Sequence, residues 1–559
     1  MIRERSYWLA ALPALSGLLF GLSFPPLDWH WLAWIALVPM AWCWTQPCLP
    51  RSAYWAAYLG GVAAHLLALS WLRTSYCYGG RWFGPYADAW LAISLLCGVF
   101  FVGMFAYGGW LARRTPLPMT LLLPVVWVSY ELVHQYGAVL IDQTGFPWCK
   151  LALTQVGGGY FLQTADLGGA SLISFLIAMV NGTVVDMMLV LSVRTGLLHR
   201  SGHAMRMPRI AGPFVAAVLL MLLAVYGRWR VAGEETEPGP VACLMGELDL
   251  PPLLDRQRIA AAVRQAQGTW PDLLLWPELA WHHKLFDAGT RLTLASLPAI
   301  PPDVAAVIGP RLKTYPGYVR QSLVGSANEF DATLLIGCER LSLGKHCWQR
   351  FNSIACTRRQ LGFQQPVIEC YDKRYPVPWA EFLPYSGGGE STGYQHGAGQ
   401  ATFRIRSREN GRTYRCRPSI CYDLCFASHF WNHATAGQTS GSPDFIFHCG
   451  AEGQDRTGAL SEVMLRMARL RAVETRRAIV RNVSQGTSGI IDGNGEVRIA
   501  AAEHAIENPI WIGPIPIDQR TSFYARFGDW PMIFICVLST LVGVSMDRKI
   551  RVLEESSSR

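Results

Sequence analysis

The chain has 559 residues, of which 51% are hydrophobic and only 16% are Asp, Glu, Lys or Arg. Soluble proteins carry about 25% of these charged residues, and the 22 Trp, 23 Phe and 20 Tyr are an aromatic load that suits membrane interfaces. The formal net charge is +9, but the basic residues flank apolar stretches and form neither basic runs nor zinc-finger spacings. Composition therefore predicts a membrane protein with no nucleic-acid partner.

Eight apolar stretches are long enough, or nearly long enough, to cross about 30 Å of hydrocarbon as helices. Soluble helices are rarely so long and so poor in charge. The first stretch is followed by further spans and by no small-residue cleavage site, so it is not expected to be a cleaved signal peptide. The predicted spans are 8–26, 29–47, 53–72, 88–112, 117–135, 169–193, 210–226 and 530–546.

Basic residues indicate the orientation of these spans. Arg3 precedes the first span, Arg113 and Arg114 lie between the fourth and fifth, and Arg548 follows the eighth. The positive-inside rule places that side, and with it both termini, in the cytoplasm, although Arg73 and Arg81 lie on the opposite side. We therefore expect a membrane domain over 1–226, a domain beyond the membrane over 227–529, and a last helix with a cytoplasmic tail over 530–559.

Short apolar runs alternate with amphipathic ones in the 227–529 block, which favours an α/β sandwich or layered sheet. Two stretches are typical of helices, Arg256–Gln267 and Leu460–Arg477. The predicted strands are Val241–Met245, Leu273–Trp276, Thr333–Gly337, Ser353–Cys356, Pro418–Cys421 and Asp444–His448.

The 15 cysteines predict neither a disulfide framework nor a metal site, because their number is odd and their spacing irregular. Cys416, Cys421 and Cys425 lie close together, but no paired CxxC or nearby HxxxH accompanies them. A P-loop, a dinucleotide fingerprint and a GxSxG elbow are also missing, so the sequence predicts no cofactor and no serine hydrolase.

Cys421 ends a short apolar run in RPSICYDLCF, so it is expected at the carboxyl edge of a strand, where open α/β sheets place their chemistry. A buried, inert thiol is the ordinary alternative for a single cysteine. Two residues at other strand ends favour a catalytic thiol over an inert one: Glu278 in WPE and Lys373 in YDKRYPVPWAEFLP. A nucleophile, a carboxylate and a lysine on three strand ends form a candidate catalytic site.

Each of these side chains has a plausible chemical part. Glu278, partly desolvated by its neighbours, could accept the thiol proton, and Lys373 could stabilise an oxyanion beside the sulfur. Glu381, eight residues after Lys373, could orient that lysine, although a structural ion pair is an equal alternative. Cys421 would then form a thioester, which either water or an amine could discharge.

These motifs together resemble the Glu-Lys-Cys signature of the nitrilase, or carbon-nitrogen hydrolase, superfamily. Combined with eight spans, the chain resembles the apolipoprotein N-acyltransferase family over nearly its whole length. Further segments that carry the resemblance are SFPPLDWHWLAWIALVP, TGFPWCKLALTQ, RMARLRAVETRRAIVRNVSQGTSGIIDGNG and YARFGDW.

The resemblance implies a nitrilase-like αββα sandwich inserted before the last helix of a bacterial inner-membrane protein, on the periplasmic side. It also implies a ping-pong reaction, in which Cys421 takes an acyl chain from a phospholipid and passes it to the amine of a diacylated lipoprotein. Glu278 would be the general base, Lys373 the oxyanion stabiliser and Glu381 an additional active-site glutamate. Tyr422 matches the family, and Asp423 stands where a glutamate is usual.

One segment departs from the family pattern. An Asn-Asp-x-Trp-Phe segment usually follows the next strand, whereas this chain has FHCGAEGQDRTG over Phe447–Gly458. His448 and Cys449 are either new site residues or loop packing. The identity of the acyl acceptor is therefore open, and two alternatives remain: a related acyltransferase or amidase with another acceptor, and an inactive membrane scaffold.

Overall fold

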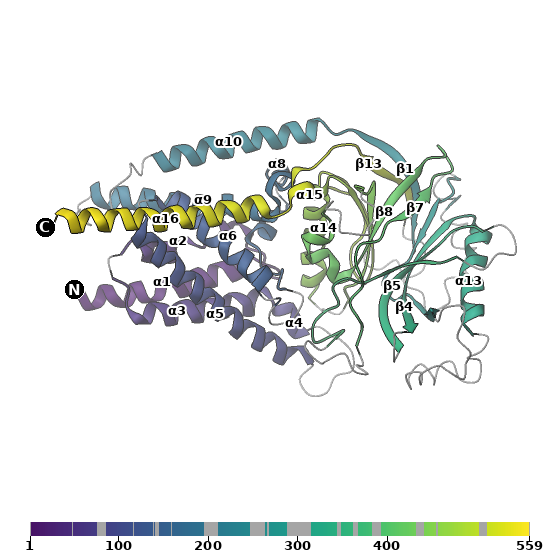
Figure 1. The fold of residues 1–559 in the computed structure, drawn as a ribbon, viewed down its shortest axis with the longest axis horizontal. Coiled ribbons are helices and arrows are strands. Elements are labelled where there is room, and N and C mark those ends of the chain that lie inside the picture. The colour runs from purple at the N-terminus through teal and green to yellow at the C-terminus, as the bar shows by residue number, and fades with distance from the viewer. Residues whose placement is uncertain are drawn as a thin grey trace.

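The computed structural model divides into a helical half and a half built on two β-sheets (Figure 1). The two chain ends lie in the helical half, at the end far from the sheets. The structure describes residues 2–46, 48–74, 85–115, 117–137, 139, 145–157, 159–194, 211–245, 263–264, 268–287, 315–343, 348–360, 367–382, 393–431, 441–453, 457–501 and 511–557.

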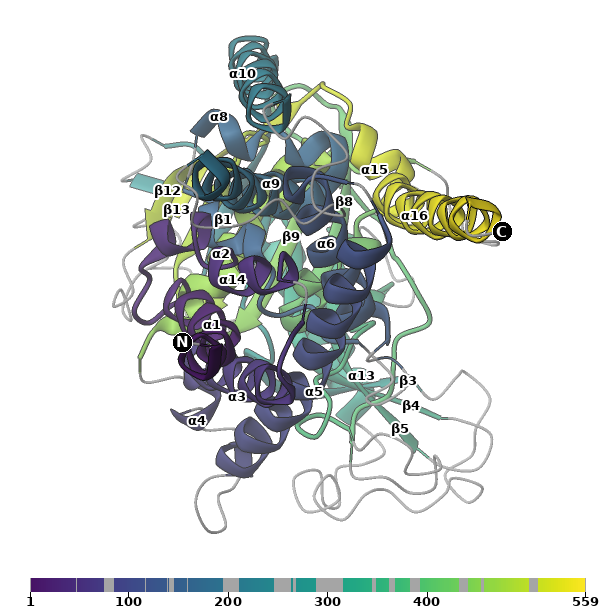
Figure 2. The same ribbon diagram turned by 90° about the vertical axis from the view of Figure 1, so that its left-hand side faces the viewer.

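Long helices make up the first half, with short ones between them. The long helices run side by side, and the chain returns to them at its end through α16 (Figures 1 and 2). The helices of this half are α1 (Ile2–Leu22), η1 (His30–Trp34), α2 (Val38–Trp44), α3 (Arg51–Ala68), α4 (Ser70–Thr74), α5 (Pro85–Arg114), α6 (Met119–Gly137), η2 (Leu151–Gln155), α8 (Gly159–Leu162), α9 (Ala165–Arg194), α10 (Ala211–Ala232), α15 (Phe523–Phe527) and α16 (Trp530–Ser557).

Three of the described helices are long and apolar enough to cross a membrane: Ala89–Arg114, Ala165–Ser192 and Gly212–Ala232. Leu9–Leu22 and Trp530–Met546 are apolar but shorter. Among the described residues, apolar helices are thus present at five of the predicted spans, and the predicted number of eight is not confirmed. Polar groups explain part of the shortfall, since α6 carries Glu131 and His134.

The predicted span over 29–47 is wrong as a single helix. The described chain there forms η1, a five-residue 3-10 turn, and then the seven-residue α2. Pro39 lies in the first turn of α2, where a missing N–H costs nothing. The same ring would disrupt a helix running through it, so the chain starts a new helix there.

The first sheet mixes parallel and antiparallel strands in the order β13-β1-β2-β4-β5-β6, and β3 pairs with β4. Strands β1, β2 and β4 are parallel neighbours, whereas β4, β5 and β6 follow one another antiparallel. The strands are β1 (Thr236–Leu244), β2 (Leu273–Leu275), β3 (Trp281–Asp287), β4 (Thr333–Leu343), β5 (Trp348–Thr357), β6 (Glu369–Asp372) and β13 (Trp511–Asp518).

The second sheet has the order β12-β11-β10-β9-β8-β7, and its centre is parallel, because β9 lies parallel to both β8 and β10. Two 3-10 turns, η6 (Cys421–Cys425) and η7 (Ala427–His429), follow β8. The strands are β7 (Phe403–Arg406), β8 (Thr413–Ile420), β9 (Phe445–Ala451), β10 (Ala478–Ser484), β11 (Ser488–Ile491) and β12 (Val497–Ala501).

The two sheets face each other across a shared apolar core, which includes Leu275 and Ile354 from one sheet and Ile420 and Phe447 from the other. Helix α13 (Tyr315–Phe330) packs on the outer face of the first sheet. Helix α14 (Ala459–Thr475) packs on the outer face of the second sheet, between that sheet and the helical half (Figure 1). The layers are therefore helix, sheet, sheet, helix.

All six strands predicted from the sequence lie within observed strands or overlap their ends. The predicted helix at Leu460–Arg477 corresponds to α14, whereas most of the one at Arg256–Gln267 lies outside the described residues. Strand β8 ends at Ile420, so Cys421 is the first residue after the strand rather than its last.

One apolar core joins the helical half to the second sheet. It runs from Phe20 and Trp127 among the helices to Tyr422 after β8, Met467 on α14 and Ile479 on β10. Because this core is continuous, the two halves cannot separate without exposing apolar surface to water.

Candidate active site

Glu278 lies just beyond the carboxyl end of β2. The Trp276 amide donates to the Leu335 carbonyl at 3.0 Å, so the pairing of β2 with β4 continues past the strand. Leu279 then turns the chain with a positive φ of 51°. Gly337 on β4 makes room for this turn, since a Cβ there would lie 2.2 Å from the Pro277 carbonyl oxygen and 2.7 Å from the Glu278 Cα.

Lys373 is the first residue after β6, and its ammonium lies between two carboxylates. The Lys373 backbone N–H donates to the Asn352 carbonyl at 2.8 Å, which fixes where its side chain leaves the sheet. The Nζ atom is 3.2 Å from Glu278 Oε1 and 2.8 Å from Glu381 Oε2. All three side chains are buried, so they interact more strongly than surface charges would.

Asn352 on β5 is a member of this cluster that the sequence analysis missed. Its Nδ2 donates to Glu278 Oε1 at 2.6 Å and to Glu381 Oε1 at 2.9 Å. Its strand, WQRFNSIACT, contains several other polar residues, so the sequence does not single Asn352 out, and its two partners lie 74 and 29 residues away. Asn352 and Lys373 together supply the donors that two buried carboxylates require.

Cys421 has a backbone conformation that ordinary side chains rarely adopt. Its φ is +45°, in the left-handed region, at the point where β8 gives way to η6. Such a conformation costs on the order of 1 kcal/mol for a non-glycine residue and tends to occur at functional sites. As a residue Cys421 is only partly buried, whereas Glu278 and Lys373 are buried.

The charges of the cluster favour a protonated thiol at rest. Burial is the main reason that the pKa of Cys421 lies well above its usual value, and the Glu278 carboxylate raises this pKa further. Lys373 acts in the opposite direction and lowers the pKa of the thiol. A thiol held in this way needs a base to become a nucleophile.

Glu278 is suited to be that base. Burial raises the pKa of Glu278, while Lys373 and the Asn352 hydrogen bond lower it again. A carboxylate with a raised pKa takes up a proton more readily than an exposed one. For Lys373, burial alone would lower the pKa, but the negative charges around it prevail and hold its pKa well above the usual value. The ammonium therefore keeps its charge.

Asp423 holds the turn that carries Cys421. Its carboxylate accepts from the Ile420 amide at 3.0 Å, the Tyr375 amide at 2.9 Å and the Tyr371 hydroxyl at 2.7 Å. Those partners come from both sides of the site, so Asp423 ties η6 to the segment around Lys373. Burial raises the pKa of Asp423 to about 6.

Tyr422 connects the site to the helical half. Its ring stacks on Trp148 with a centroid distance of 5.7 Å, and its hydroxyl donates to the Gly145 carbonyl at 3.3 Å. Both partners belong to the TGFPWC segment, whose place in the fold the sequence alone did not predict. The residue after Cys421 therefore rests on the helices.

Two residues of the unusual Phe447–Gly458 segment lie near the cluster. His448 on β9 is buried, its Nδ1 lies 3.2 Å from the Ser419 Oγ, and burial holds its pKa well below the usual range. Glu452 forms a buried ion pair with Arg481 and is close enough to raise the pKa of Cys421. Cys449 is fully buried in the core between the sheets.

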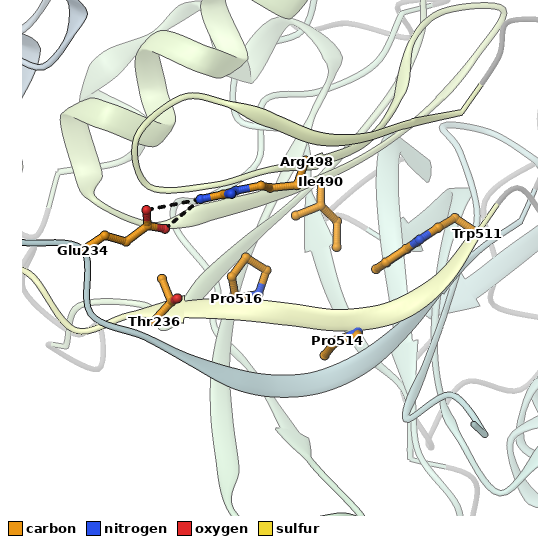
Figure 3. A pocket seen from close by; sticks show the side chains of 7 residues that line it. All are labelled: Glu234, Thr236, Ile490, Arg498, Trp511, Pro514 and Pro516. Atoms are coloured by element: carbon orange, nitrogen blue, oxygen red, sulfur yellow. Dashed lines mark hydrogen bonds and ion pairs between the residues drawn. The ribbon is translucent and has the colours of Figure 1, made fainter. Parts of the chain in front are cut away.

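A cavity of about 470 Å³ lies elsewhere, beside the paired strands β1 and β13 (Figure 3). Figure 3 shows Arg498 pointing toward Glu234 across this cavity, where the guanidinium donates to both carboxylate oxygens at 3.1 and 3.2 Å. The other lining residues are Thr236, Ile490, Trp511, Pro514 and Pro516. None of the residues in the Glu278 cluster lines this cavity.

Buried carboxylates that share a lysine beside a cysteine are an arrangement that permits covalent acyl chemistry. Comparison with known proteins points the same way. Residues 16–183 match the family model described as the apolipoprotein N-acyltransferase N-terminal domain. The chain is also similar to curated apolipoprotein N-acyltransferases. The protein of Geobacter metallireducens is 25% identical over 94% of this chain and 92% of its own length.

Other relatives align over comparable lengths. The protein of Gloeobacter violaceus is 24% identical, covering 92% of this chain and 89% of its own. That of Caulobacter vibrioides is 23% identical, covering 100% and 97%. Among solved structures, a mutant of the Nesterenkonia AN1 amidase from the nitrilase superfamily is similar with a TM-score of 0.33 and 15% identity, over 52% of this chain and 95% of the amidase. Over nearly its whole length the chain is thus similar to apolipoprotein N-acyltransferases, and it is an acyltransferase.

Proposed function

We propose that this protein moves an acyl chain from a phospholipid, through a thioester on Cys421, to the N-terminal amine of a diacylglyceryl-cysteine lipoprotein. The observation that carries the proposal is the Lys373 ammonium held between Glu278 and Glu381 beside a cysteine in a left-handed turn. The full-length similarity to apolipoprotein N-acyltransferases supplies the two substrates.

In the first half-reaction, Glu278 accepts the thiol proton and the Cys421 sulfur attacks the ester carbonyl of the phospholipid. Lys373 stabilises the negative charge that develops on the carbonyl oxygen. The ester C–O bond then breaks, the lysophospholipid oxygen takes the proton from Glu278, and the acyl chain stays on the sulfur.

In the second half-reaction, the amine of the lipoprotein attacks the thioester carbonyl, and Glu278 accepts a proton from the nitrogen. The C–S bond breaks, and the proton held by Glu278 passes to the leaving sulfur, which restores the thiol. Glu381 and Asn352 act as positioning residues, because each contacts the carboxylate or the ammonium and neither supplies a nucleophile.

The proposal includes the finer architecture. The helical half crosses the bacterial inner membrane eight times, with the interrupted stretch of η1 and α2 as the second crossing. Both termini are cytoplasmic, and the nitrilase-like sheets lie on the periplasmic side. The domain limits are then 1–226, 227–529 and 530–559. The contact of Tyr422 with Trp148 supports a site at the membrane surface, since it places the turn bearing Cys421 directly on the helices. Both substrates are anchored in lipid and would reach such a site laterally.

A two-stage assay tests the function. Purified full-length protein in detergent is mixed with a phospholipid labelled in its acyl chain, and a diacylated lipopeptide with a free N-terminal amine is then added. We expect the label to reach the lipopeptide amine. Release of the label as free fatty acid, with none on the lipopeptide, would instead favour a hydrolase of the same superfamily.

Matched variants separate chemistry from folding. Cys421→Ala is expected to abolish transfer, whereas Cys370→Ala, a cysteine on β6 outside the cluster, should retain it. Full transfer by Cys421→Ala would contradict the proposed nucleophile. It would favour the alternative in which the nitrilase-like domain is an inactive scaffold and the transfer activity comes from another source.

A further inference from the structure

Three potential metal ligands from three helices meet inside the helical half. They are His65 on α3, Cys97 on α5 and His134 on α6, and their ligating atoms all lie within 4.8 Å of one another. All three side chains are buried. Ionisable groups among apolar helices are costly and are kept mainly where they have a function.

Two glycines explain why these helices approach so closely. A Cβ on Gly61 of α3 would lie 2.5 Å from the Phe101 Cβ of α5, and one on Gly98 would lie 2.7 Å from the Val62 Cγ2. Small residues at such a crossing let the helix backbones come together. His65 follows Gly61 by about one turn, and Cys97 precedes Gly98, so the crossing brings both ligands to one place.

The hydrogen bonding of His65 prepares it as a ligand. Its Nδ1 lies 2.7 Å from the Gly61 carbonyl oxygen, and because that oxygen only accepts, Nδ1 carries the proton and donates. The Nε2 lone pair is therefore free, and within the described residues this buried atom has no hydrogen-bond partner. Histidines that bind metals commonly donate their other ring N–H to a carbonyl in this way.

Aromatic rings hold His134 in place beside His65. The Tyr130 ring stacks on His134 at 5.2 Å, and the Phe146 and Phe100 rings contact it edge-on at 4.7 and 5.2 Å. The two imidazoles lie 5.6 Å apart, centre to centre. This apolar shell fixes the orientation of the ring and excludes water from the cluster.

We propose that His65, Cys97 and His134 form a binding site for one monovalent copper ion. A thiolate and two imidazoles are a soft ligand set, and trigonal His₂Cys coordination is characteristic of copper. Charge favours Cu⁺ as well: with the Cys97 thiolate and two neutral imidazoles the site has no net charge, whereas a divalent ion would leave an uncompensated positive charge among apolar helices. Binding releases the Cys97 proton to solvent.

The spacing of the three side chains fits such an ion. Metal–nitrogen bonds of about 2.0 Å and metal–sulfur bonds of about 2.3 Å place ligating atoms roughly 3.4–3.8 Å apart. Because the ligating atoms already lie within 4.8 Å of one another, binding an ion requires only a small inward movement of the side chains. Among the described residues this is the group with the geometry of a metal site, and its members lie 32 and 37 positions apart, so no sequence motif reveals it.

The metal site also lies next to the segment that supports the turn after Cys421, and an ion there would stiffen this segment. Phe146 packs on His134, and its neighbours Gly145 and Trp148 contact Tyr422. An ion that immobilises the His134 ring would thereby order the segment on which the turn after β8 rests. This role is independent of the proposed acyl transfer, because copper binding is measured without any substrate.

Copper titration of the full-length protein tests the site. Protein purified in detergent with its cysteines reduced is titrated with Cu⁺ against a chromophoric Cu⁺ chelator. We expect the wild type to bind one more equivalent than Cys97→Ala, while Cys43→Ala, which removes another buried cysteine of the helical half, binds as the wild type does. Equal binding by wild type and Cys97→Ala would overturn the proposal.

X-ray absorption of the wild-type protein loaded with one equivalent keeps the test decisive if a variant fails to fold. One sulfur and two nitrogen neighbours are expected at copper, and coordination by sulfur alone would overturn the assignment. Binding of one Zn²⁺ at the cluster in preference to Cu⁺ would overturn the choice of a monovalent ion.

Discussion

At the scale of single residues, the cluster around Lys373 shows which features the sequence reveals. Glu278, Lys373 and Cys421 each follow a recognisable apolar run, so they could be predicted as members of one candidate site from their places at strand ends. Asn352 and Tyr371 could not, because their importance comes from partners that only tertiary pairing brings near. The same holds for Glu452, which lies in the segment that departs from the apolipoprotein N-acyltransferase pattern.

Asn352 provides a test of how Glu278 is tuned. Asn352→Ala removes one of the donors that lower the pKa of Glu278 and leaves that carboxylate with the Lys373 ammonium, while Glu381 still accepts from the Val377 amide. We expect transfer to fall about 10- to 100-fold, as for other supporting hydrogen bonds. Because the base must be deprotonated, activity is lost as the pH falls through the pKa of Glu278, and the acid limb of the pH profile should shift to higher pH in the variant. A uniform loss at every pH would contradict this role.

The raised pKa of Asp423 can be tested through the pH dependence of the protein's stability. Burial raises its pKa to about 6 from a usual value near 3.9, so the folded protein binds the proton more tightly than the unfolded chain. Its stabilising contribution is therefore complete below about pH 4 and is lost as the pH rises through 6, by up to ~3 kcal/mol. The Tm advantage of wild type over Asp423→Asn should be larger at pH 4.5 than at pH 7.5. An advantage that is constant or grows with pH would argue against a raised pKa.

At the scale of elements, the strands that carry the site were predictable because their side chains are apolar and their ends are marked by Pro, Asp or Glu. The helices were less predictable from the sequence. The stretch 29–47 is as apolar as a span, yet Pro39 restarts the chain there, and hydropathy alone does not reveal that break. Close approaches between elements were also invisible in the sequence, although they decide where site residues lie.

One such close approach is that of Gly337 on β4 to the turn after β2. Ala at this position would place a Cβ against the backbone of Pro277 and Glu278, which cannot rotate away, so the turn after β2 must move. A displacement of about 1 Å at a catalytic base can cost 100-fold in rate, and we expect a loss of that order. Gly325→Ala on α13 is the control, because nothing lies within 4 Å of its Cβ and alanine favours the helix. Equal activity of the two variants would mean that the position of Glu278 is not critical.

At the scale of the whole molecule, the helical and sheet halves form one structure. Composition predicts a membrane part and an α/β part, but it gives no sign that they share a core or that buried charges cross between them. Arg476, which follows α14, donates to Asp166 on α9 at 2.8 Å and to Gln163 at 2.6 Å. Its role follows from residues about 310 positions away, which is why the sequence did not reveal it.

Arg476→Met tests this junction. Removing a buried partner typically costs 3–5 kcal/mol, and we expect about 3 kcal/mol because Arg230 still contacts Asp166. Arg412→Met removes an exposed partner of Glu237 and should leave the stability nearly unchanged. Thermal unfolding in detergent measures both. Similar Tm values for the two variants would show that the halves are held by their apolar core alone.

The proposed function depends on Cys421 as the carrier of the acyl group, and mass spectrometry of the digested protein tests this role. The full-length protein is incubated with phospholipid in the absence of any acceptor and then digested. We expect one acyl chain on the peptide bearing Cys421, released by hydroxylamine as a thioester must be, and absent from Cys421→Ala. An acyl chain on another residue, or no adduct under conditions where transfer to the lipopeptide proceeds, would contradict it.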